Sequence, residues 1–197
     1  MERFTIQKND FLSHDCTGYF HLYYVGYGQP GNPDYLNTLK NIFVSTHPDM
    51  LRAASRQAAA LMIQDIPQVM DAEGLDTAIL MAVPRSKSGM CNWQLGFKAA
   101  VRTAVKALQD NNLSVFDGTD FIFRHTSTKM THLRKPVSNF ENTGSEPYPG
   151  ITKDTCDIQN EYLKGRTVIL IDDIYTKTVN VDEDCIQALY DTGAARV

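Results

Sequence analysis

Two short segments, at residues 77–83 and 167–175, stand out because each contains a continuous run of apolar residues. The second begins with Val168, Ile169, Leu170 and Ile171, and it leads directly into an acidic pair. Continuous apolar runs of this length predict strands that are buried on both faces, as in a parallel sheet. We therefore expect each run to be a core strand.

Other segments have apolar residues at helical spacing, which predicts helices at 49–70, 92–109 and 182–191 and a short helix within 33–45. The residues expected to face the core are Leu51, Ala54, Ala58, Leu61, Met62, Leu95, Ala99, Val101, Val105, Leu108, Ile186, Ala188 and Leu189. Aromatic and β-branched residues predict further strands at 19–27, 114–116 and 121–123. Strands alternate with helices, which indicates an α/β fold whose mainly parallel sheet has helices on both faces.

One long segment, residues 127–163, has little apolar periodicity and contains Gly144, Pro147, Pro149 and Gly150. Structureless loops of this length are uncommon in compact domains, where they are usually functional lids or disordered insertions. Both interpretations stay open from the sequence.

Composition narrows the class of protein. A chain of 197 residues with 43% hydrophobic residues is long enough for one compact domain. The net charge of −4 gives no indication of a nucleic-acid surface. No apolar run is long enough to span a membrane or to form a signal-peptide core, so we expect a cytoplasmic protein. The scattered cysteines, which contain no CxxC pair, predict neither a zinc ribbon nor a disulfide framework.

The acidic pair Asp172 and Asp173 is the most informative feature, because ligands of open α/β sheets bind at the carboxyl ends of strands. Carboxylates there accept hydrogen bonds from hydroxyls or hold a divalent metal ion. The polar loop 176–180 and the helix start after it suit a phosphate group. The same letters also resemble a Walker B strand, but no GxxxxGK[ST] motif precedes them. In a response regulator the acidic pair lies near the N-terminus, whereas too little chain follows it here.

The hydrophobic strand, the two acids, Ile174-Tyr175 and the loop 176–180 together resemble the phosphoribosyl diphosphate (PRPP) motif of type I phosphoribosyltransferases. Residues 77–85 look like the strand and loop that bind pyrophosphate in that family, and the GAARV sequence at 193–197 looks like the turn into its next strand. The order and spacing are most similar to the ComF-like branch, and the resemblance covers about 75–197.

This resemblance implies a doubly wound, mainly parallel sheet flanked by helices, with residues 1–48 as a small N-terminal hood and 49–197 as the core of a single compact domain. It also implies roles for the acids: Asp172 and Asp173 bind the ribose hydroxyls of PRPP and contact Mg²⁺ indirectly.

The resemblance further implies that the loop after the acids holds the 5′-phosphate; its residues are Thr176, Lys177, Thr178, Val179 and Asn180. Thr178 stands where the family prefers glycine, which permits backbone angles that a β-branched residue resists. Lys177 adds a cation that can compensate. The acids Asp182, Glu183 and Asp184 favour the helix start through its dipole, but they would repel a phosphate if they pointed inward.

Two further sets of residues follow from the resemblance. Arg85, Ser86, Lys87 and Ser88 form the expected pyrophosphate loop, with cations and hydroxyls that suit a diphosphate. Arg124, Lys129 and Arg134 are the candidates for a mobile loop that closes over pyrophosphate.

The expected activity is transfer of the ribose 5-phosphate unit of PRPP to a nitrogenous base or amine, with release of pyrophosphate. Mg²⁺ is the expected cofactor and a homodimer the expected assembly. The alternatives are a catalytically inactive PRPP- or nucleotide-binding regulatory protein on the same fold, and a ComF-like accessory protein. Fold alone does not separate these functions.

Overall fold

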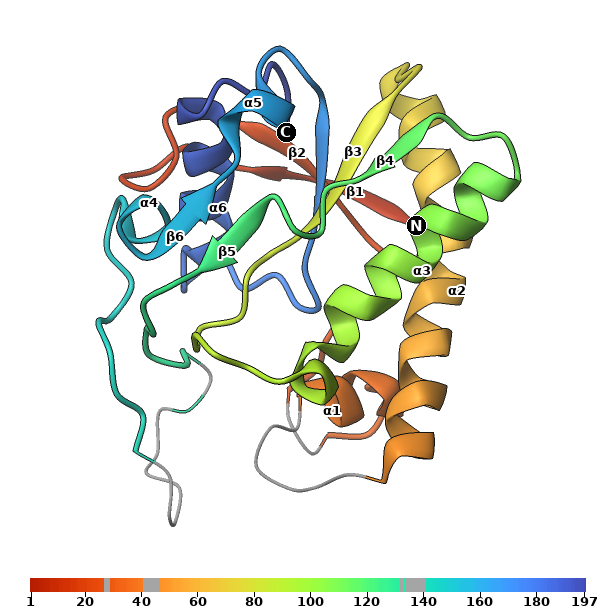
Figure 1. Cartoon of the computed structure of the whole chain (residues 1–197), viewed down its shortest axis with the longest axis horizontal. Helices are drawn as coiled ribbons and strands as arrows, with labels where there is room; N and C mark the ends of the chain where they lie inside the picture. Colours follow the sequence, from red (N-terminus) through yellow and green to blue (C-terminus); the bar gives the residue numbers. More distant parts are fainter. Residues whose placement is uncertain (27–28, 41–46, 132, 134–140) are drawn as a thin grey trace.

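The computed structural model describes residues 1–26, 29–40, 47–131, 133 and 141–197. Its helices and strands alternate through most of the chain (Figure 1). In chain order they are β1 (Glu2–Ile6), β2 (Cys16–Phe20), α1 (Asp34–Lys40), α2 (Pro48–Glu73), β3 (Ala78–Ala82), the 3-10 helix η1 (Asn92–Leu95), α3 (Gly96–Asp110), β4 (Val115–Asp117), β5 (Ile122–Arg124), α4 (Ile151–Thr155), β6 (Cys156–Ile158), α5 (Asn160–Leu163), β7 (Val168–Ile171) and α6 (Val181–Asp191).

The central sheet is parallel and has the strand order β4-β3-β7. In its register Ile79 pairs with Val168 on one side and with Phe116 on the other. After α6 the chain returns alongside β7, where Thr167 and Arg196 form a parallel bridge. All residues of β3 are buried, whereas β7 is mostly half-buried. Burial on both faces is therefore confirmed for β3 but only partly for β7.

The two faces of the sheet pack against different helices. Leu80 packs with α2 and α3 residues such as Met62 and Val101, whereas Met81 packs with Leu189 of α6 and Leu163 of α5. Alternate residues of one strand thus contribute to two apolar clusters, as strand geometry requires. The protein is therefore an α/β fold with a three-stranded parallel sheet flanked by helices.

The predicted helices are confirmed, with small shifts in which residues face the core. In α2, Ala54, Ala58 and Met62 are buried as expected. In α3 the expectation for Ala99 is wrong, because that residue is exposed and Ala100 is fully buried instead. Nothing among the described helices is both long and apolar enough to cross a membrane.

The expectation of a strand over 19–27 is wrong in position. The strand is β2, which pairs antiparallel with β1 in a register that ends at Glu2 and Phe20. Residues after Phe20 therefore have no partner strand in this hairpin, and Leu22 and Tyr23 are left exposed. Gly18 suits this pairing because a Cβ there would lie 2.4 Å from the Phe4 ring.

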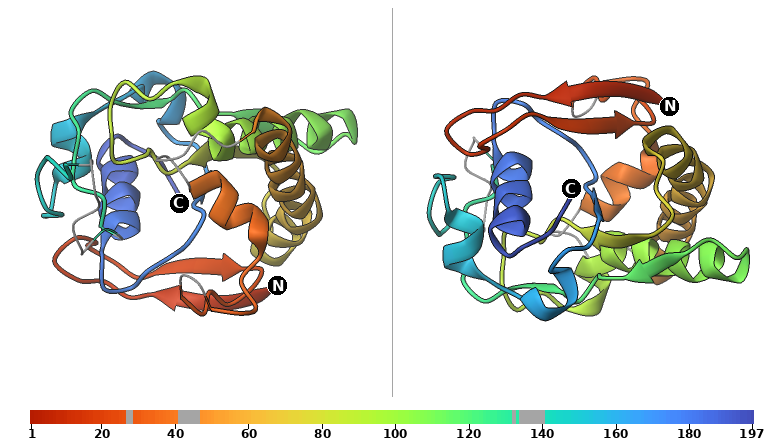
Figure 2. Two further views of the ribbon diagram at one scale, coloured as in Figure 1. Left: turned by 90° about the horizontal axis from the view of Figure 1, so that it is seen from below. Right: turned by 90° about the horizontal axis from the view of Figure 1, so that it is seen from above.

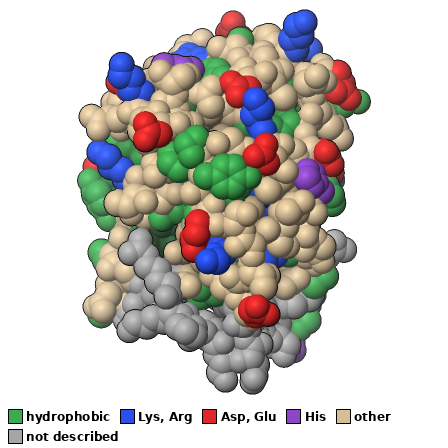
Figure 3. Space-filling model, turned by 90° about the vertical axis from the view of Figure 1, so that its left-hand side faces the viewer, with side chains coloured by type: hydrophobic (Ala, Val, Ile, Leu, Met, Phe, Trp, Pro, Cys, Tyr) green, Lys and Arg blue, Asp and Glu red, His purple; other side chains and the backbone are tan. Residues whose placement is uncertain are grey.

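The β1–β2 hairpin runs along the side of the molecule opposite α3, from α6 at its turn to α2 at the N-terminus (Figure 2). Its residues Ile6, Leu12 and Cys16 pack with Ile186 of α6. On the face shown in Figure 3, acidic and basic side chains are intermixed. The hairpin and α1 fall within residues 1–48, for which the separate hood stays a prediction.

The segment 127–163 contains more regular structure than its sequence pattern indicates. It includes α4, β6 and α5, and β6 pairs antiparallel with β5 outside the central sheet. The interpretation as a disordered insertion is therefore wrong for 151–163. Residues 132 and 134–140 lie outside the described part of the chain, and the predicted catalytic lid stays untested.

Candidate functional site

The site begins with a reversal of chain direction between β3 and β7. From β3 the chain passes through α3 to β4 on one side, and from β7 it passes through α6 to Arg196 on the other side. These helices lie on opposite faces of the sheet. Such a reversal is the topological switch point at which open α/β sheets bind ligands. The carboxyl ends of β3 and β7 meet there, so the two predicted loops are neighbours.

Asp173 joins these loops to the N-terminal region. One of its carboxylate oxygens lies 2.9 Å from Lys40 Nζ, and the other lies 3.6 Å from an Arg85 guanidinium nitrogen. Its side chain is only 10% exposed, so these ion pairs are shielded from water more than surface pairs are. The structure thus brings together two predicted residues, Arg85 and Asp173, and adds Lys40, which the sequence did not indicate.

Asp172 lies next to a second carboxyl, that of Asp182 in the first turn of α6, and the two are hydrogen-bonded. Burial and the charges of Glu183 and Asp173 raise the pKa of Asp182 to about 7, although the hydrogen bond from Asp172 lowers it in part. Desolvation and the charges of Asp173 and Asp182 raise the pKa of Asp172 well above its usual range. The Asp172 residue also has an exposed surface, so water offsets part of this desolvation. The pair therefore holds a proton near neutral pH.

The three acids at the start of α6 all point into the protein. Asp184 accepts hydrogen bonds from the backbone N–H groups of Gly150 (2.5 Å) and Thr152 (2.7 Å), so it caps α4. Glu183 accepts a hydrogen bond from the Tyr175 hydroxyl at 2.8 Å. Asp182 Oδ1 and Glu183 Oε2 are buried without a hydrogen-bond partner. Negative charge therefore lies directly behind the predicted phosphate loop.

The predicted phosphate loop, residues 176–180, forms a turn in which Val179 N–H donates to the Thr176 carbonyl at 3.0 Å. Its left-handed residue is Asn180, with φ 58°, while Thr178 has a negative φ. The loss of glycine at 178 thus creates no backbone strain, because the left-handed position falls on asparagine, which tolerates it.

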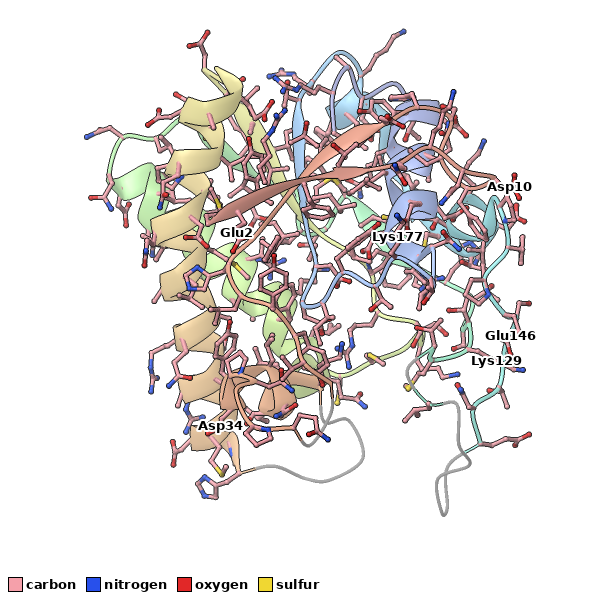
Figure 4. The ribbon with its side chains drawn as sticks, turned by 180° about the vertical axis from the view of Figure 1, so that it is seen from behind. Glu2, Asp10, Asp34, Lys129, Glu146 and Lys177 are labelled. Atoms are coloured by element: carbon pink, nitrogen blue, oxygen red, sulfur yellow. The ribbon has the colours of Figure 1, made fainter. Side chains whose placement is uncertain are left out.

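The β1–β2 connection lies against this loop. Lys177 Nζ donates to Gln7 Oε1 at 3.1 Å, and Asn9 donates through its amide to Asn180 Oδ1 at 2.9 Å. Figure 4 shows Lys177 beside the start of α6, close to the hairpin. Residues of the predicted hood therefore contact the loop directly.

The predicted pyrophosphate loop is bound to the segment that follows β5. The Ser86 carbonyl accepts a hydrogen bond from Thr128 N–H at 2.7 Å, and the hydroxyls of Ser88 and Ser127 lie 3.0 Å apart. Lys87 Nζ donates to the carbonyls of Thr128 and Thr143 at 2.8 and 2.5 Å. Burial lowers the pKa of Lys87. Arg85, another cation of this loop, contacts Asp173 of the acidic pair.

The mobile-loop candidates have different surroundings. Arg124 is a buried residue of β5 that donates to the Arg85 carbonyl at 2.6 Å and to the Thr155 hydroxyl, so its placement in a mobile loop is wrong. Lys129 pairs with Glu146 at 2.7 Å, at the edge of the molecule away from Lys177 (Figure 4). Arg134 lies outside the described residues.

The chemistry available at the switch point is recognition of hydroxyl and phosphate groups. Asp172 and Asp173 are hydrogen-bond acceptors, and Lys40 and Arg85 are donors with positive charge. Within the described parts of the chain, no group of three or more His, Cys, Asp or Glu side chains suits a metal ion. Both Asp173 oxygens already contact cations, so a Mg²⁺ ion fits here only when a ligand supplies most of its oxygens, with the exposed Asp172 reached through water.

A comparison of the chain with protein-family models, curated proteins and solved structures finds no match, so its function is inferred from the geometry of this site.

Proposed function

We propose that this protein is a phosphoribosyltransferase that transfers the ribose 5-phosphate unit of PRPP to a nitrogenous acceptor. The observation that carries the proposal is the meeting of Asp172, Asp173 and Arg85 at the switch point of a parallel sheet. A doubly wound sheet of the type I phosphoribosyltransferase kind, with residues 1–48 as its hood, is part of the same proposal.

In this proposal the acidic pair binds the sugar. The carboxylate of Asp173 and the carboxyl of Asp172, which shares a proton with Asp182, accept hydrogen bonds from the 2- and 3-hydroxyls of the ribose. Thr176 and the loop amides donate to the 5′-phosphate, whose charge Lys177 offsets. Arg85 moves from Asp173 to the diphosphate when the ribose hydroxyls replace it. Mg²⁺, bound through the diphosphate, supplies charge that neutralises the leaving group.

In the transfer step no side chain of the protein forms a covalent bond to the substrate. The lone pair of the acceptor nitrogen forms a bond to C1 of the ribose. The bond between C1 and the pyrophosphate oxygen breaks, and its electron pair leaves with pyrophosphate. An acceptor that carries N–H then loses a proton to water. The fixed carboxylate of Asp173 beside the ribose stabilises the positive charge that develops on the ring, which is catalysis by positioning and electrostatics.

A second candidate is a regulatory protein that binds PRPP or a nucleotide without turnover. The buried acids Asp182 and Glu183 favour it, because negative charge behind the loop opposes phosphate binding. The carbonyl contacts of Lys87 also favour it, since they engage a loop cation that would otherwise bind the diphosphate.

The test is a pyrophosphate-release assay with PRPP, Mg²⁺ and a panel of nitrogenous bases and amines. The proposal expects release that depends on one acceptor and falls at least about 100-fold in the Asp172→Asn/Asp173→Asn variant, given the usual size of electrostatic contributions. PRPP binding without release for any acceptor would instead support the regulatory protein. Release that persists in the variant would contradict the assigned site.

A further inference from the structure

A small hollow lies at the carboxyl end of β3, between the start of α3 and β5. Its volume is about 130 Å³, close to the roughly 150 Å³ of an engineered apolar cavity that binds benzene. Its apolar walls are formed by Ala82, Val83, Pro84, Met90, Leu95, Phe97, Ile122 and Phe123. The hollow therefore has the size and lining for a single six-membered ring.

Arg124 supplies an unpaired positive charge to this hollow. It lines the hollow, and the residue is only 8% exposed. Its guanidinium donates to the carbonyl of Arg85 and to the hydroxyl of Thr155, both neutral oxygens. Among the described residues, no carboxylate lies within salt-bridge distance of it. Since buried charges are normally paired, this guanidinium is poised for an anion that the protein itself does not provide.

The other cations at the hollow already have partners. Lys98 pairs with Asp120 at 2.7 Å, and Arg85 contacts Asp173. Lys87 donates to backbone carbonyls. Arg124 is therefore the cation with which a ligand's negative charge would pair.

We propose that the hollow binds a small aromatic or heteroaromatic carboxylate. The ring packs against the apolar walls, and the carboxylate accepts charge-assisted hydrogen bonds from Arg124. A planar carboxylate matches the planar guanidinium better than a single polar group would. A diphosphate suits the hollow less well. Its charged oxygens would lose their hydrogen bonds to water, and the apolar side chains of Phe97, Leu95 and Ile122 offer no hydrogen bonds in return.

The hollow is next to the candidate PRPP site, because Arg85 both lines the hollow and contacts Asp173. If the proposed phosphoribosyl transfer holds, this carboxylate is the class of acceptor, with a ring or amino nitrogen as the nucleophile. That assignment rests on the proposed function, whereas binding in the hollow does not.

The experiment uses benzoate as the probe and its neutral analogue benzamide as the matched control, without PRPP. The full chain is labelled at methionine and isoleucine methyl groups, and chemical shifts are followed during titration. We expect benzoate to shift the methyl signals of Met90 and Ile122 but not that of Met50, and benzamide to bind about tenfold more weakly. If the Met90 and Ile122 signals do not shift, or if the two probes bind with equal affinity, the proposal is overturned.

Two variants separate charge from shape. Arg124→Met is expected to lose the preference for benzoate, so that both probes bind alike; a retained preference would overturn the role of Arg124. Should this variant not fold, Met90→Trp provides a second test, because it fills the hollow while leaving Arg124 in place. It should abolish binding of both probes; unchanged binding would show that benzoate binds outside the hollow, which overturns the proposal.

Two further outcomes keep this inference distinct from the proposed function. Pyrophosphate that displaces benzoate and shifts the same methyl signals would show that the hollow belongs to the diphosphate, which overturns the carboxylate assignment. Benzoate that binds equally well to the Asp172→Asn/Asp173→Asn variant would support a separate site, even if PRPP fails to bind the wild-type protein.

Discussion

Replacing Asp182 by asparagine should stabilise the protein at alkaline pH. The Asp182 residue is 8% exposed, its Oδ1 has no hydrogen-bond partner, and it lies beside Asp172. The rise of its pKa from 3.8 to about 7 corresponds to about 4 kcal/mol of free energy of unfolding. Because the asparagine amide must also be buried, we expect the Asp182→Asn variant to gain about half of this, about 2 kcal/mol.

The sign of the pH dependence follows from the direction of this shift. A carboxyl whose pKa is higher in the folded state binds more protons when folded, so stability falls as pH rises between about 4 and about 7. The free-energy cost of burying the ionised Asp182 carboxylate is absent below the pKa of this group in the unfolded state and complete above its pKa in the folded state. The Asp182→Asn variant should therefore be about 2 kcal/mol less stable than the wild type at pH 4, where only the cost of burying the amide remains, and about 2 kcal/mol more stable at pH 8, as measured by urea unfolding.

Asp184 is the matched control, because it is buried in the same helical turn but both its oxygens accept hydrogen bonds. Asp184→Asn should destabilise the protein by about 1.5–3 kcal/mol, the usual contribution of hydrogen bonds to a charged group. If Asp182→Asn destabilises the protein at pH 8 as Asp184→Asn does, then Asp182 is paired and the reasoning is refuted.

Three other predictions concern the loop and the core. Thr178→Gly should change PRPP affinity less than about threefold, since Thr178 already has an ordinary backbone conformation; a large gain in calorimetry would contradict this. Asn180→Ala should be about 1 kcal/mol less stable than Asn180→Gly in urea unfolding, because residue 180 is left-handed; equal stabilities would argue against that conformation. Leu189→Ala should lose about 2–5 kcal/mol, because Leu189 is fully buried between α6 and the sheet; a loss below about 1 kcal/mol would contradict this packing.

The local elements could be predicted from the sequence because their signals are local. The apolar run 77–83 and the helical spacing of Ala54, Ala58 and Met62 predicted β3 and α2 within a few residues. The GAARV sequence predicted a return toward the sheet, and Arg196 does bridge to Thr167. When two strands are parallel and adjacent, the loops after them lie side by side. The loops after β3 and β7 do so, and Arg85 of one contacts Asp173 of the other.

Contacts between distant segments could not be predicted in the same way. Nothing around Lys40 indicates that it reaches Asp173, because the pairing depends on how α1 packs against α2. A basic residue after a strand looks like a loop residue, and the burial of Arg124 arises only from the pairing of β5 with β6. The inward direction of Asp182 and Glu183 could not be predicted either, because the helix dipole favours acids at a helix start whichever way their side chains point.

The most direct test of the central claim is calorimetric titration of PRPP with Mg²⁺ into the wild-type protein and the Asp172→Asn/Asp173→Asn variant. A folded variant, checked by its circular dichroism, is the required control. We predict saturable binding to the wild-type protein that the variant loses. No binding to the wild-type protein at millimolar PRPP, or equal binding to both proteins, would contradict a PRPP site at the switch point.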